Sequence, residues 1–206
     1  MSENKFLESK SLHFKDLFPI EISRKINEFA GENKLNYRLK REMKSKFVNK
    51  YGFDRLYKLG YRDFSDIDVP GKLIKDVCLW KCKFENSNMS RCKFISTELT
   101  WCVFRDTNLD NCYVNNCTFM NSMFINSDMN KIIMTDCHAF DAIFSCVRLS
   151  NSIINNSRFE GAMFPGSRLV GTKCTNCIFD DLIGCNTTGT IFINDCLLYT
   201  SDAADE

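Results

Sequence analysis

Large apolar residues recur at every fifth position through the middle of the chain. The series begins at Phe64 and ends at Phe179, and none of its members is charged or carries an amide. A second series lies two positions before the first. From Cys82 to Cys177 it consists, with two exceptions, of residues no larger than threonine or cysteine. A period of five fits neither an α-helix, with about 3.6 residues per turn, nor a simple strand, whose side chains alternate at every residue. Such a fixed period predicts a solenoid.

The two series predict a coil with flat sides of five residues each. On each side, one large apolar side chain and one small side chain face the axis, and the other three positions lie at the surface or form the corner. Asparagine, aspartate and glycine gather two positions after the large residue, because these residues tolerate turn geometry. The predicted corner residues are Asn86, Asp106, Asn111, Asn116, Asn121, Asn126, Asp136, Asp141, Asn151, Asn156, Gly161, Gly166, Gly171, Asn176 and Asp181.

The repeating unit resembles that of the pentapeptide-repeat family, whose consensus is A-(D/N)-L-x-x. The units that show it most closely are Ser87-Asn88-Met89, Thr107-Asn108-Leu109 and Ser127-Asp128-Met129. The resemblance implies a mainly β fold, a right-handed quadrilateral β-helix with four units per coil. Between Phe64 and Phe179 it implies roughly six coils, and at about 4.8 Å per rung a tower roughly 25–30 Å tall. The frame weakens at Cys174 and fails at Gly184 and Gly189.

Three regions are expected along the chain. Residues 1–61 form an N-terminal helical cap, in which a helical pattern around Ile20 precedes a second one over residues 33–51. Residues 62–195 form the pentapeptide-repeat β-helix, regular to about residue 181, and in its last part Ile191 and Phe192 are candidate core residues. Residues 196–206 resemble a translated sequencing adapter and are expected to be a non-native tail. In that case the native protein departs from this sequence after Asp195 and continues for an unknown length.

The second helical pattern has an apolar face and a basic face. Leu35, Leu39, Met43 and Phe47 form the apolar face, which we expect to dock on the first coil because an open solenoid end exposes core and unpaired strand groups. The remaining positions are mostly basic: Lys34, Arg38, Lys40, Arg41, Lys44, Lys46 and Lys50. We favour a solvated face for these residues over binding to acidic lipid or nucleic acid.

The positions of the cysteines suggest buried side chains rather than metal ligands or nucleophiles. Most of the twelve cysteines occupy the small inward position, where cysteine acts as a small hydrophobe. Stacked pairs such as Cys82 and Cys102 are expected to be near neighbours that stay reduced. The lone Cys174-x-x-Cys177 pair is a weak metal motif. His138 points outward while its neighbour Cys137 faces the core, so they do not form a nucleophile pair. No catalytic motif is found, and neither a metal nor a cofactor is expected.

Charge and hydropathy bear on where the protein is expected to act and on its expected partners. The formal net charge is +1, and the repeats from Lys72 to Asp195 hold twelve basic and twelve acidic residues. Neither a signal peptide nor a transmembrane segment is recognisable. We expect a bacterial cytoplasmic protein. A further hypothesis is that a type III system secretes it into a host cell. Membrane association is not indicated, and nucleic acid is not an expected partner.

One outer corner of the predicted coil is unusually apolar. Its candidate partner-binding residues are Trp101, Val103, Met120, Met123, Phe140, Ile143 and Met163. A smaller strip, formed by Tyr113, Ile133 and Ile153, is expected on the opposite side. A sizeable exposed apolar patch usually marks an interface. The patch either binds a host protein or a second copy of the chain, or it is covered by the N-terminal helices or a downstream segment.

Three functions remain open. The first is a non-enzymatic protein-interaction scaffold, which resembles the EspX and PipB groups of type III effectors of enteric bacteria. The second is the substrate-binding front of a truncated effector resembling HECT-type ubiquitin ligases. The third is a gyrase-binding DNA mimic, as in the quinolone-resistance branch of the family. This last role needs a strongly negative surface, which the balanced charges of the repeats do not provide.

Overall fold

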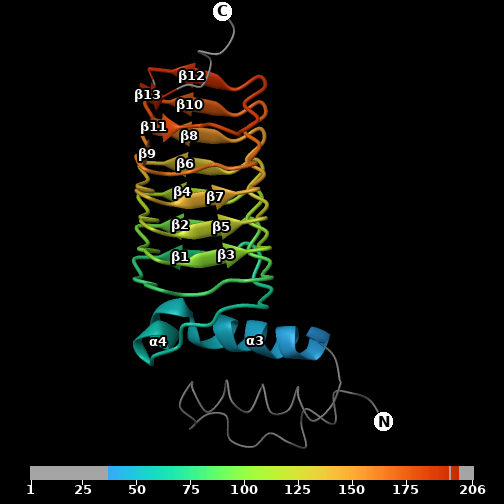
Figure 1. Ribbon diagram of the computed structural model, residues 1–206. Helices are drawn as coiled ribbons and strands as arrows, with labels where there is room; N and C mark the ends of the chain where they lie inside the picture. The colour runs from blue at the N-terminus through green and yellow to red at the C-terminus, as the bar shows by residue number, and fades with distance from the viewer. Residues whose placement is uncertain (1–36, 195, 200–206) are drawn as a thin grey trace, which may run out of the picture.

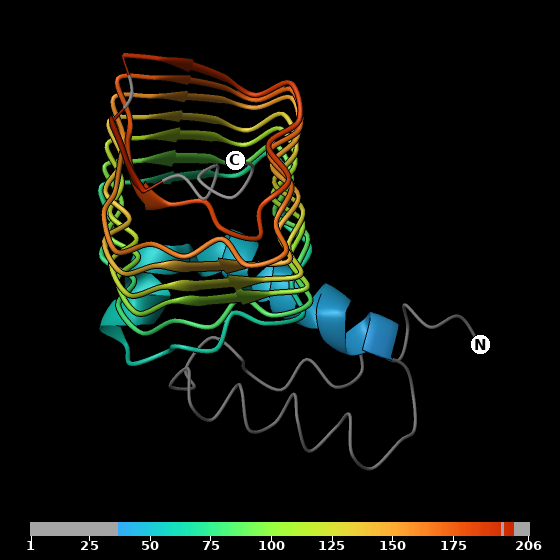
Figure 2. The same cartoon turned by 45° about the horizontal axis from the view of Figure 1, so that its top comes forward.

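The computed structural model describes residues 37–194 and 196–199. The helix predicted around Ile20, Leu35 and most of the predicted tail lie outside these residues. The described chain forms two helices followed by a tower of parallel strands (Figure 1). Turning the tower shows that its coil has four sides (Figure 2). The fold is mainly β, a β-solenoid of about six turns, as the repeat predicts.

The strands fall into three parallel sheets, each running along one side of the tower. The seven-stranded sheet contains β1 (Leu73–Lys75), β2 (Lys93–Ile95), β4 (Tyr113–Asn115), β6 (Ile133–Thr135), β8 (Ile153–Asn155), β10 (Lys173–Thr175) and β12 (Ile191–Ile193). A second side contains β3 (Val103–Arg105), β5 (Met123–Ile125) and β7 (Ile143–Ser145). A third contains β9 (Arg158–Phe159), β11 (Ile178–Asp181) and β13 (Cys196–Tyr199). The remaining side is joined by isolated parallel bridges such as Asn88 with Asn108.

Successive coils are in register at intervals of twenty residues until the last coil. Ile154 pairs with Cys174, twenty positions on, whereas Cys174 pairs with Phe192, only eighteen positions on. The shortening falls after β11, where the sequence frame fails at Gly184. Of the two candidate core residues of this coil, Phe192 packs against the core, but Ile191 is exposed. The prediction for Ile191 was wrong because β12 turns this position outward.

The two sequence series form the core. Every large residue from Phe64 to Phe179 is buried, and so is every small residue from Cys82 to Cys177. The phenylalanines that are twenty positions apart stack in one interior column. Their ring centroids lie 4.7–5.5 Å apart: Phe64, Phe84, Phe104, Phe124, Phe144 and Phe164. The predicted aromatic ladder is therefore confirmed.

The small inward hydroxyls are satisfied by the coil before them. Ser127 Oγ donates to the carbonyl oxygen of Phe104 at 2.9 Å, and Ser167 Oγ donates to that of Phe144 at 2.6 Å. Each hydroxyl lies 23 positions after the residue whose carbonyl accepts it. Burying a hydroxyl without a hydrogen bond is costly, so these contacts allow serine in the core.

The corners adopt left-handed backbone. All the predicted corner residues except Asp181 have φ between 49° and 69°. Asparagine, aspartate and glycine suit this region because β-carbon crowding disfavours it for most residues. Asp181 instead ends β11 in the shortened coil and does not form such a corner.

Helix α3 (Tyr37–Tyr51) and helix α4 (Phe53–Lys58) cover the first coil. From α4, Phe53 and Leu56 are buried against the core. Phe53 packs on Phe64 with ring centroids 4.9 Å apart. The two helices therefore extend the core over the beginning of the tower.

The docking face of α3 differs from the predicted one. Its buried residues are Lys44, Ser45 and Val48, whereas Leu39 and Met43 are only half-buried. The reason is the unpaired backbone of the first coil, whose polar groups need partners. Lys44 and Ser45 supply them and therefore lie on the docking face. Phe47, of the predicted set, does pack against the core.

Candidate interaction surface

The seven candidate residues lie along one corner of the tower, between the β9–β11–β13 side and the β3–β5–β7 side. We call this set the apolar ridge: Trp101, Val103, Met120, Met123, Phe140, Ile143 and Met163. Val103, Met123 and Ile143 are stacked neighbours in β3, β5 and β7. Met163 continues this column through a bridge with Ile143. Around the corner, the Trp101 amide donates to the Met120 carbonyl oxygen at 2.9 Å, which places Met120 one coil beyond Trp101.

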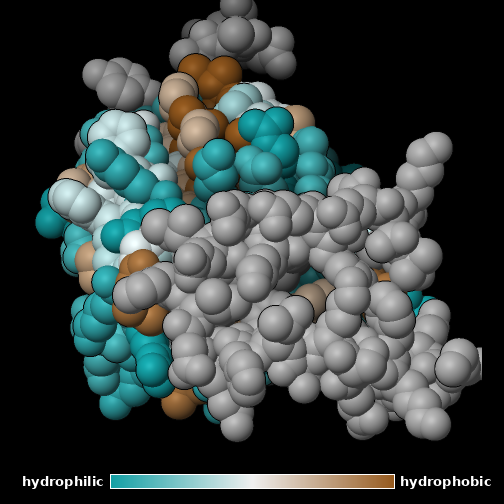
Figure 3. Space-filling view, turned by 90° about the horizontal axis from the view of Figure 1, so that it is seen from below, coloured by the Kyte–Doolittle hydropathy of each residue, from teal (hydrophilic) through white to brown (hydrophobic). Residues whose placement is uncertain are grey.

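Three ridge side chains are well exposed. Trp101 is 53%, Met120 37% and Met163 54% exposed. The other four ridge residues are half-buried. Hydrophobic side chains also reach the surface in separate patches among hydrophilic ones when the molecule is viewed from the cap end (Figure 3). The ridge therefore has three well-exposed side chains and four side chains that are partly covered by their neighbours.

The coil fixes the direction of the ridge side chains. On β5, Met123 points outward because the next residue, Phe124, points into the aromatic ladder. The same alternation holds on β3 and β7. The ridge side chains on these strands cannot turn into the core without displacing a stacked phenylalanine, so the surface is pre-formed.

Phe140 is supported by a residue of its own coil and by one of the next coil. Its ring stacks on His138 with centroids 5.8 Å apart and planes at 11°. From the next coil, the Arg158 guanidinium lies over the same ring at 5.3 Å. Arg158 is held in turn by Glu160, whose carboxylate accepts from Nε at 2.8 Å. These contacts hold the Phe140 ring in place and cover part of it. The side chain is therefore half-buried rather than fully exposed.

Trp101 occupies a corner that suits other residues better. Its φ is 61°, and Asn121 and Asp141 occupy the corresponding position in the next two coils. A left-handed backbone costs a residue with a β-carbon roughly 1–2 kcal/mol, and Asn and Asp tolerate it best. Trp101 therefore places a large, more than half-exposed indole at a corner whose backbone favours asparagine or aspartate.

The opposite side carries a more broken apolar strip than predicted. Tyr113, Ile133 and Ile153 are exposed there, as the sequence suggests, and Leu73 and Ile191 extend the same column at its two ends. Lysines at positions 93 and 173 interrupt the strip in the same column. Trp80, which the predicted patch did not include, is exposed at the cap end of the ridge. It lies in the same outward column as Thr100 and Met120, twenty and forty residues before them.

In the polar outward columns, side chains of successive coils contact one another. Asn88 Nδ2 donates to Asp68 Oδ1 at 2.8 Å, and Arg148 pairs with Asp128 one coil before it. The fold uses these side chains, and it also uses some of the basic residues of the cap. Lys44, for example, is 3% exposed and donates to the Ser65 carbonyl oxygen at 2.8 Å.

The cysteines of the described chain are free thiols, and all but Cys78, Cys146 and Cys185 are buried. Burial raises the pKa of the Cys92 and Cys117 thiols to about 11 and that of Cys137 to about 12. Burial also raises the pKa of Cys102. A thiol that stays protonated is a poor nucleophile. His138 lies at the surface beside Cys137, as predicted, so the two side chains diverge.

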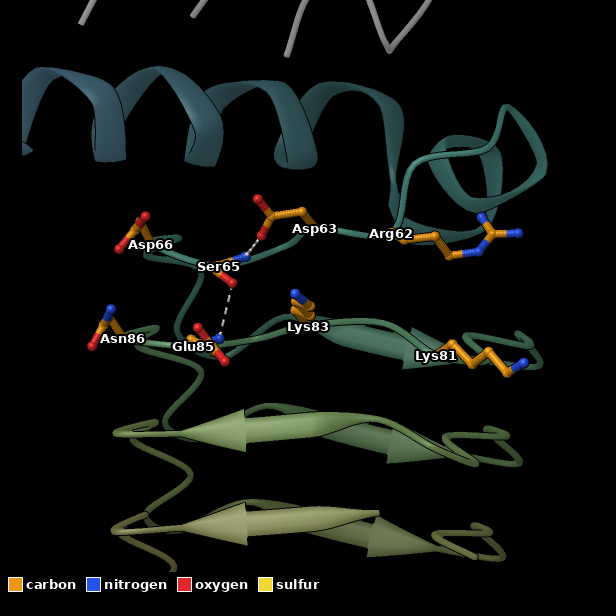
Figure 4. A pocket seen from close by; sticks show the side chains of 8 residues that line it. All are labelled: Arg62, Asp63, Ser65, Asp66, Lys81, Lys83, Glu85 and Asn86. Carbon is orange, nitrogen blue, oxygen red and sulfur yellow. Dashed lines mark hydrogen bonds between the residues drawn. The ribbon is translucent and has the colours of Figure 1, made fainter. Parts of the chain in front are cut away.

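No group of three or more metal-ligating residues suited to a metal ion is found in the described part of the chain. A polar hollow of about 330 Å³ lies beside the cap (Figure 4). It is lined by Arg62, Asp63, Ser65, Asp66, Lys81, Lys83, Glu85 and Asn86. In this hollow the Ser65 amide donates to Asp63 Oδ1 and the Glu85 amide donates to Ser65 Oγ, so these polar groups already serve the fold. Within residues 37–194 and 196–199, no helix is long and apolar enough to cross a membrane.

Solved structures with a similar coil come from varied sources. A trypsin-treated variant of QnrB1, a plasmid-mediated fluoroquinolone resistance protein, is 16% identical with a TM-score of 0.47, covering 67% of this chain and 85% of its own. HetL of Nostoc sp. strain PCC 7120, involved in heterocyst differentiation regulation, is 11% identical with a TM-score of 0.31, covering 69% and 92%. A pentapeptide repeat protein of the Arabidopsis thaliana thylakoid lumen is 19% identical with a TM-score of 0.32, covering 49% and 63%. No curated protein matches the chain.

The repeat itself is what a family model recognises. Eight copies of the model for pentapeptide repeats match residues 75–109, 102–138 and 142–181, which together make up about half of the chain. These are the residues that form the regular coils and carry the ridge. The chain belongs to the pentapeptide-repeat family.

Proposed function

We propose that this protein is a non-enzymatic scaffold that binds a partner protein through the apolar ridge. The observation that carries the proposal is the exposure of Trp101, Met120 and Met163 along one corner of a rigid solenoid. Exposed apolar patches on single chains usually mark interfaces. Methionine and aromatic residues are enriched in interface cores, and methionine adapts its shape to a partner.

The rigidity of the support favours this role. The ridge rests on β3, β5 and β7, whose inward residues form the aromatic ladder. A surface that is already in its binding shape loses little conformational entropy when a partner binds. A solenoid side therefore presents a flat, pre-formed platform.

The charge of the repeats disfavours the DNA-mimic alternative. Twelve basic residues balance twelve acidic ones from Lys72 to Asp195. Imitating phosphates needs an excess of negative charge. A supercoiling assay with purified gyrase checks this directly, and we expect neither inhibition nor protection at high protein concentration.

As part of the proposal, we keep the hypothesis that the protein is a secreted bacterial effector. Its support is the resemblance to effectors of enteric bacteria. Fusion of a translocation reporter to the full chain tests it in a strain with and without a type III system. The alternative, a front end of a ligase resembling the HECT type, is tested by sequencing the gene past the codon for Asp195.

The ridge proposal is tested by two aspartate substitutions. Met120→Asp with Met163→Asp places charges on well-exposed positions, where we expect loss of partner binding and a melting temperature within a few degrees of the wild type. The matched control is Ile133→Asp with Ile153→Asp on the opposite side, which we expect to bind normally. The control residues are 39% and 41% exposed. A large fall in the melting temperature of the ridge variant would show that the ridge is internal packing.

The structure guides this choice of residues. Met123 and Phe140 are the central ridge residues in the sequence, but both are half-buried. Phe140 also supports His138 and Arg158. Replacing these residues would mix a loss of stability with a loss of binding, so the more exposed methionines give the clearer experiment.

A further inference from the structure

The ridge is charged differently at its two ends. At the cap end, Lys81 and Lys83 are exposed and lie next to Trp80. Among the described residues, neither ammonium group has a hydrogen-bond or ion-pair partner. In Figure 4 the Lys81 side chain extends away from the carboxylates of Asp63 and Glu85. Two unpaired cations therefore border the beginning of the ridge.

The far end of the ridge is acidic. Three carboxylates gather around Gly161, those of Asp141, Glu160 and Asp180. The Gly161 amide donates to Asp180 Oδ2 at 2.6 Å. A β-carbon at position 161 would collide with the Asp141 carboxylate, which therefore lies along the same corner. Arg158 balances Glu160. An excess of two negative charges remains among these four side chains.

We propose that the partner on the apolar ridge is a second copy of this chain, packed side by side and antiparallel to the first. This inference rests on the proposed function and names its partner. The backbone register sets the arrangement, because Lys83 lies two coils before Met123 and Met163 lies two coils after it. A two-fold axis that crosses the ridge near Met120 and Met123 brings the cationic end of each copy onto the acidic end of the other.

The antiparallel direction follows from the charges. In a parallel pair, Lys83 would face Lys83 and the carboxylates would face carboxylates, which is unfavourable. In the antiparallel pair, both ends attract and the apolar centre is buried between them. A two-fold interface must be complementary to itself, and the ridge has this property because its charges have opposite sign on either side of an apolar centre.

Zero-length crosslinking of the full chain tests the direction. Within one copy, Lys83 and Glu160 are separated by four rungs, roughly 19 Å at about 4.8 Å per rung. An amide formed between them by carbodiimide must therefore join two copies. We expect an equal mixture of isotopically light and heavy protein to give mixed crosslinks from Lys81 or Lys83 to Asp141 or Glu160. Crosslinks confined to one copy, or their absence in an associated sample, would overturn the proposal.

Charge reversal tests the complementarity. Lys81→Glu with Lys83→Glu makes both ends acidic, and Asp141→Lys with Glu160→Lys makes both ends basic. We expect each variant alone to self-associate at least about tenfold more weakly than the wild type, because like charges then meet. An equal mixture of the two is expected to recover association, as measured by sedimentation velocity at low salt. Retained self-association of the separate variants would contradict the proposal.

Self-association and the role of the ridge as a binding surface can be disproved separately. A wild-type chain that stays monomeric at high concentration overturns self-association but leaves the ridge as a surface for another protein. A large loss of stability in the Met120→Asp and Met163→Asp variant overturns the ridge as a surface for any partner. Lys81 and Lys83 lie outside the hydrophobic core, so their variants are expected to fold normally.

Discussion

The rings of Phe104 and Phe124 lie parallel, with centroids 4.7 Å apart and planes within 1° of each other. Their spacing equals the rise of one coil, about 4.8 Å between neighbouring strands. The same relation repeats from Phe84 to Phe164, with centroid distances of 4.7–4.8 Å. The ladder therefore fixes the register of the coils from inside, while the ridge occupies the outer face of the same strands.

Replacing Phe124 by alanine is expected to lower the free energy of unfolding by about 3–5 kcal/mol, the usual range for removing a buried phenylalanine. The ring is fully enclosed between Phe104 and Phe144, so its loss leaves a cavity that the stacked coils cannot close. Chemical denaturation measures the effect. A loss below about 1 kcal/mol would mean that the ladder does not bear on stability.

Lys44 of α3 is expected to be important for the cap. Its ammonium group donates to the Ser65 carbonyl oxygen at 2.8 Å and lies 3.6 Å from Asp63 Oδ2. Lys44→Met removes these contacts, and leaving a buried acceptor unpaired costs about 1–3 kcal/mol. Lys46→Met is the control, because its pair with Glu42 is exposed and such pairs contribute less than about 1 kcal/mol. Equal melting temperatures for the two variants would contradict the role of Lys44.

Stability is expected to fall with rising pH in the alkaline range. In the unfolded chain the thiols lose their protons near their ordinary pKa of 9.0, whereas in the fold burial raises the pKa of Cys92 and Cys117 to about 11 and that of Cys137 to about 12. Between these values the unfolded state binds fewer protons than the folded one. By linkage, the stabilisation present below pH 9 is then lost progressively as the pH rises.

Urea denaturation at several pH values between 8 and 11 measures this decline. The control is Cys117→Ser, which removes one titrating thiol from an inward position that serine fills in other coils, as at Ser127. We expect a shallower pH dependence for this variant than for the wild type. Identical slopes would show that the buried thiols do not cause the decline.

Trp101→Asn is expected to separate stability from binding. Asparagine suits the left-handed corner better than tryptophan and would follow the pattern of Asn121 in the next coil. We expect the free energy of unfolding to rise by up to about 1 kcal/mol. Partner binding should weaken at the same time, since the most prominent aromatic group of the ridge is lost. A variant that is less stable than the wild type would mean that the indole contributes to packing.

The sequence predicts the coil well because its signal repeats. A single frame of five places every large buried residue from Phe64 to Phe179, and an error at one unit is corrected by its neighbours. The seven ridge residues follow from the same frame, since outward positions in successive coils form columns. The same spacing of outward positions also predicts the smaller strip at Tyr113. It does not predict the exposed fraction of each side chain.

The features that the sequence analysis missed are those without a repeat. The docking face of α3 was assigned by hydrophobic spacing, but the unpaired backbone of the first coil selects Lys44 and Ser45 instead. The Asp68 amide, for example, donates to Ser45 Oγ at 2.7 Å. The eighteen-residue last coil, with its outward Ile191 and its missing corner at Asp181, depends on how the shortened segment packs on one particular coil.

Hydroxyl-radical footprinting of the full chain tests the central claim most directly. Trp101, Met120 and Met163 on the ridge are the reporters, and Tyr113 on the opposite side is the control. The account predicts that the three reporters are oxidised readily in the dilute protein and become protected when the partner binds, or as concentration rises in the case of self-association, while Tyr113 stays unchanged. Protection of the ridge in the dilute single chain, or equal oxidation in the free and associated states, would contradict the ridge as the binding surface.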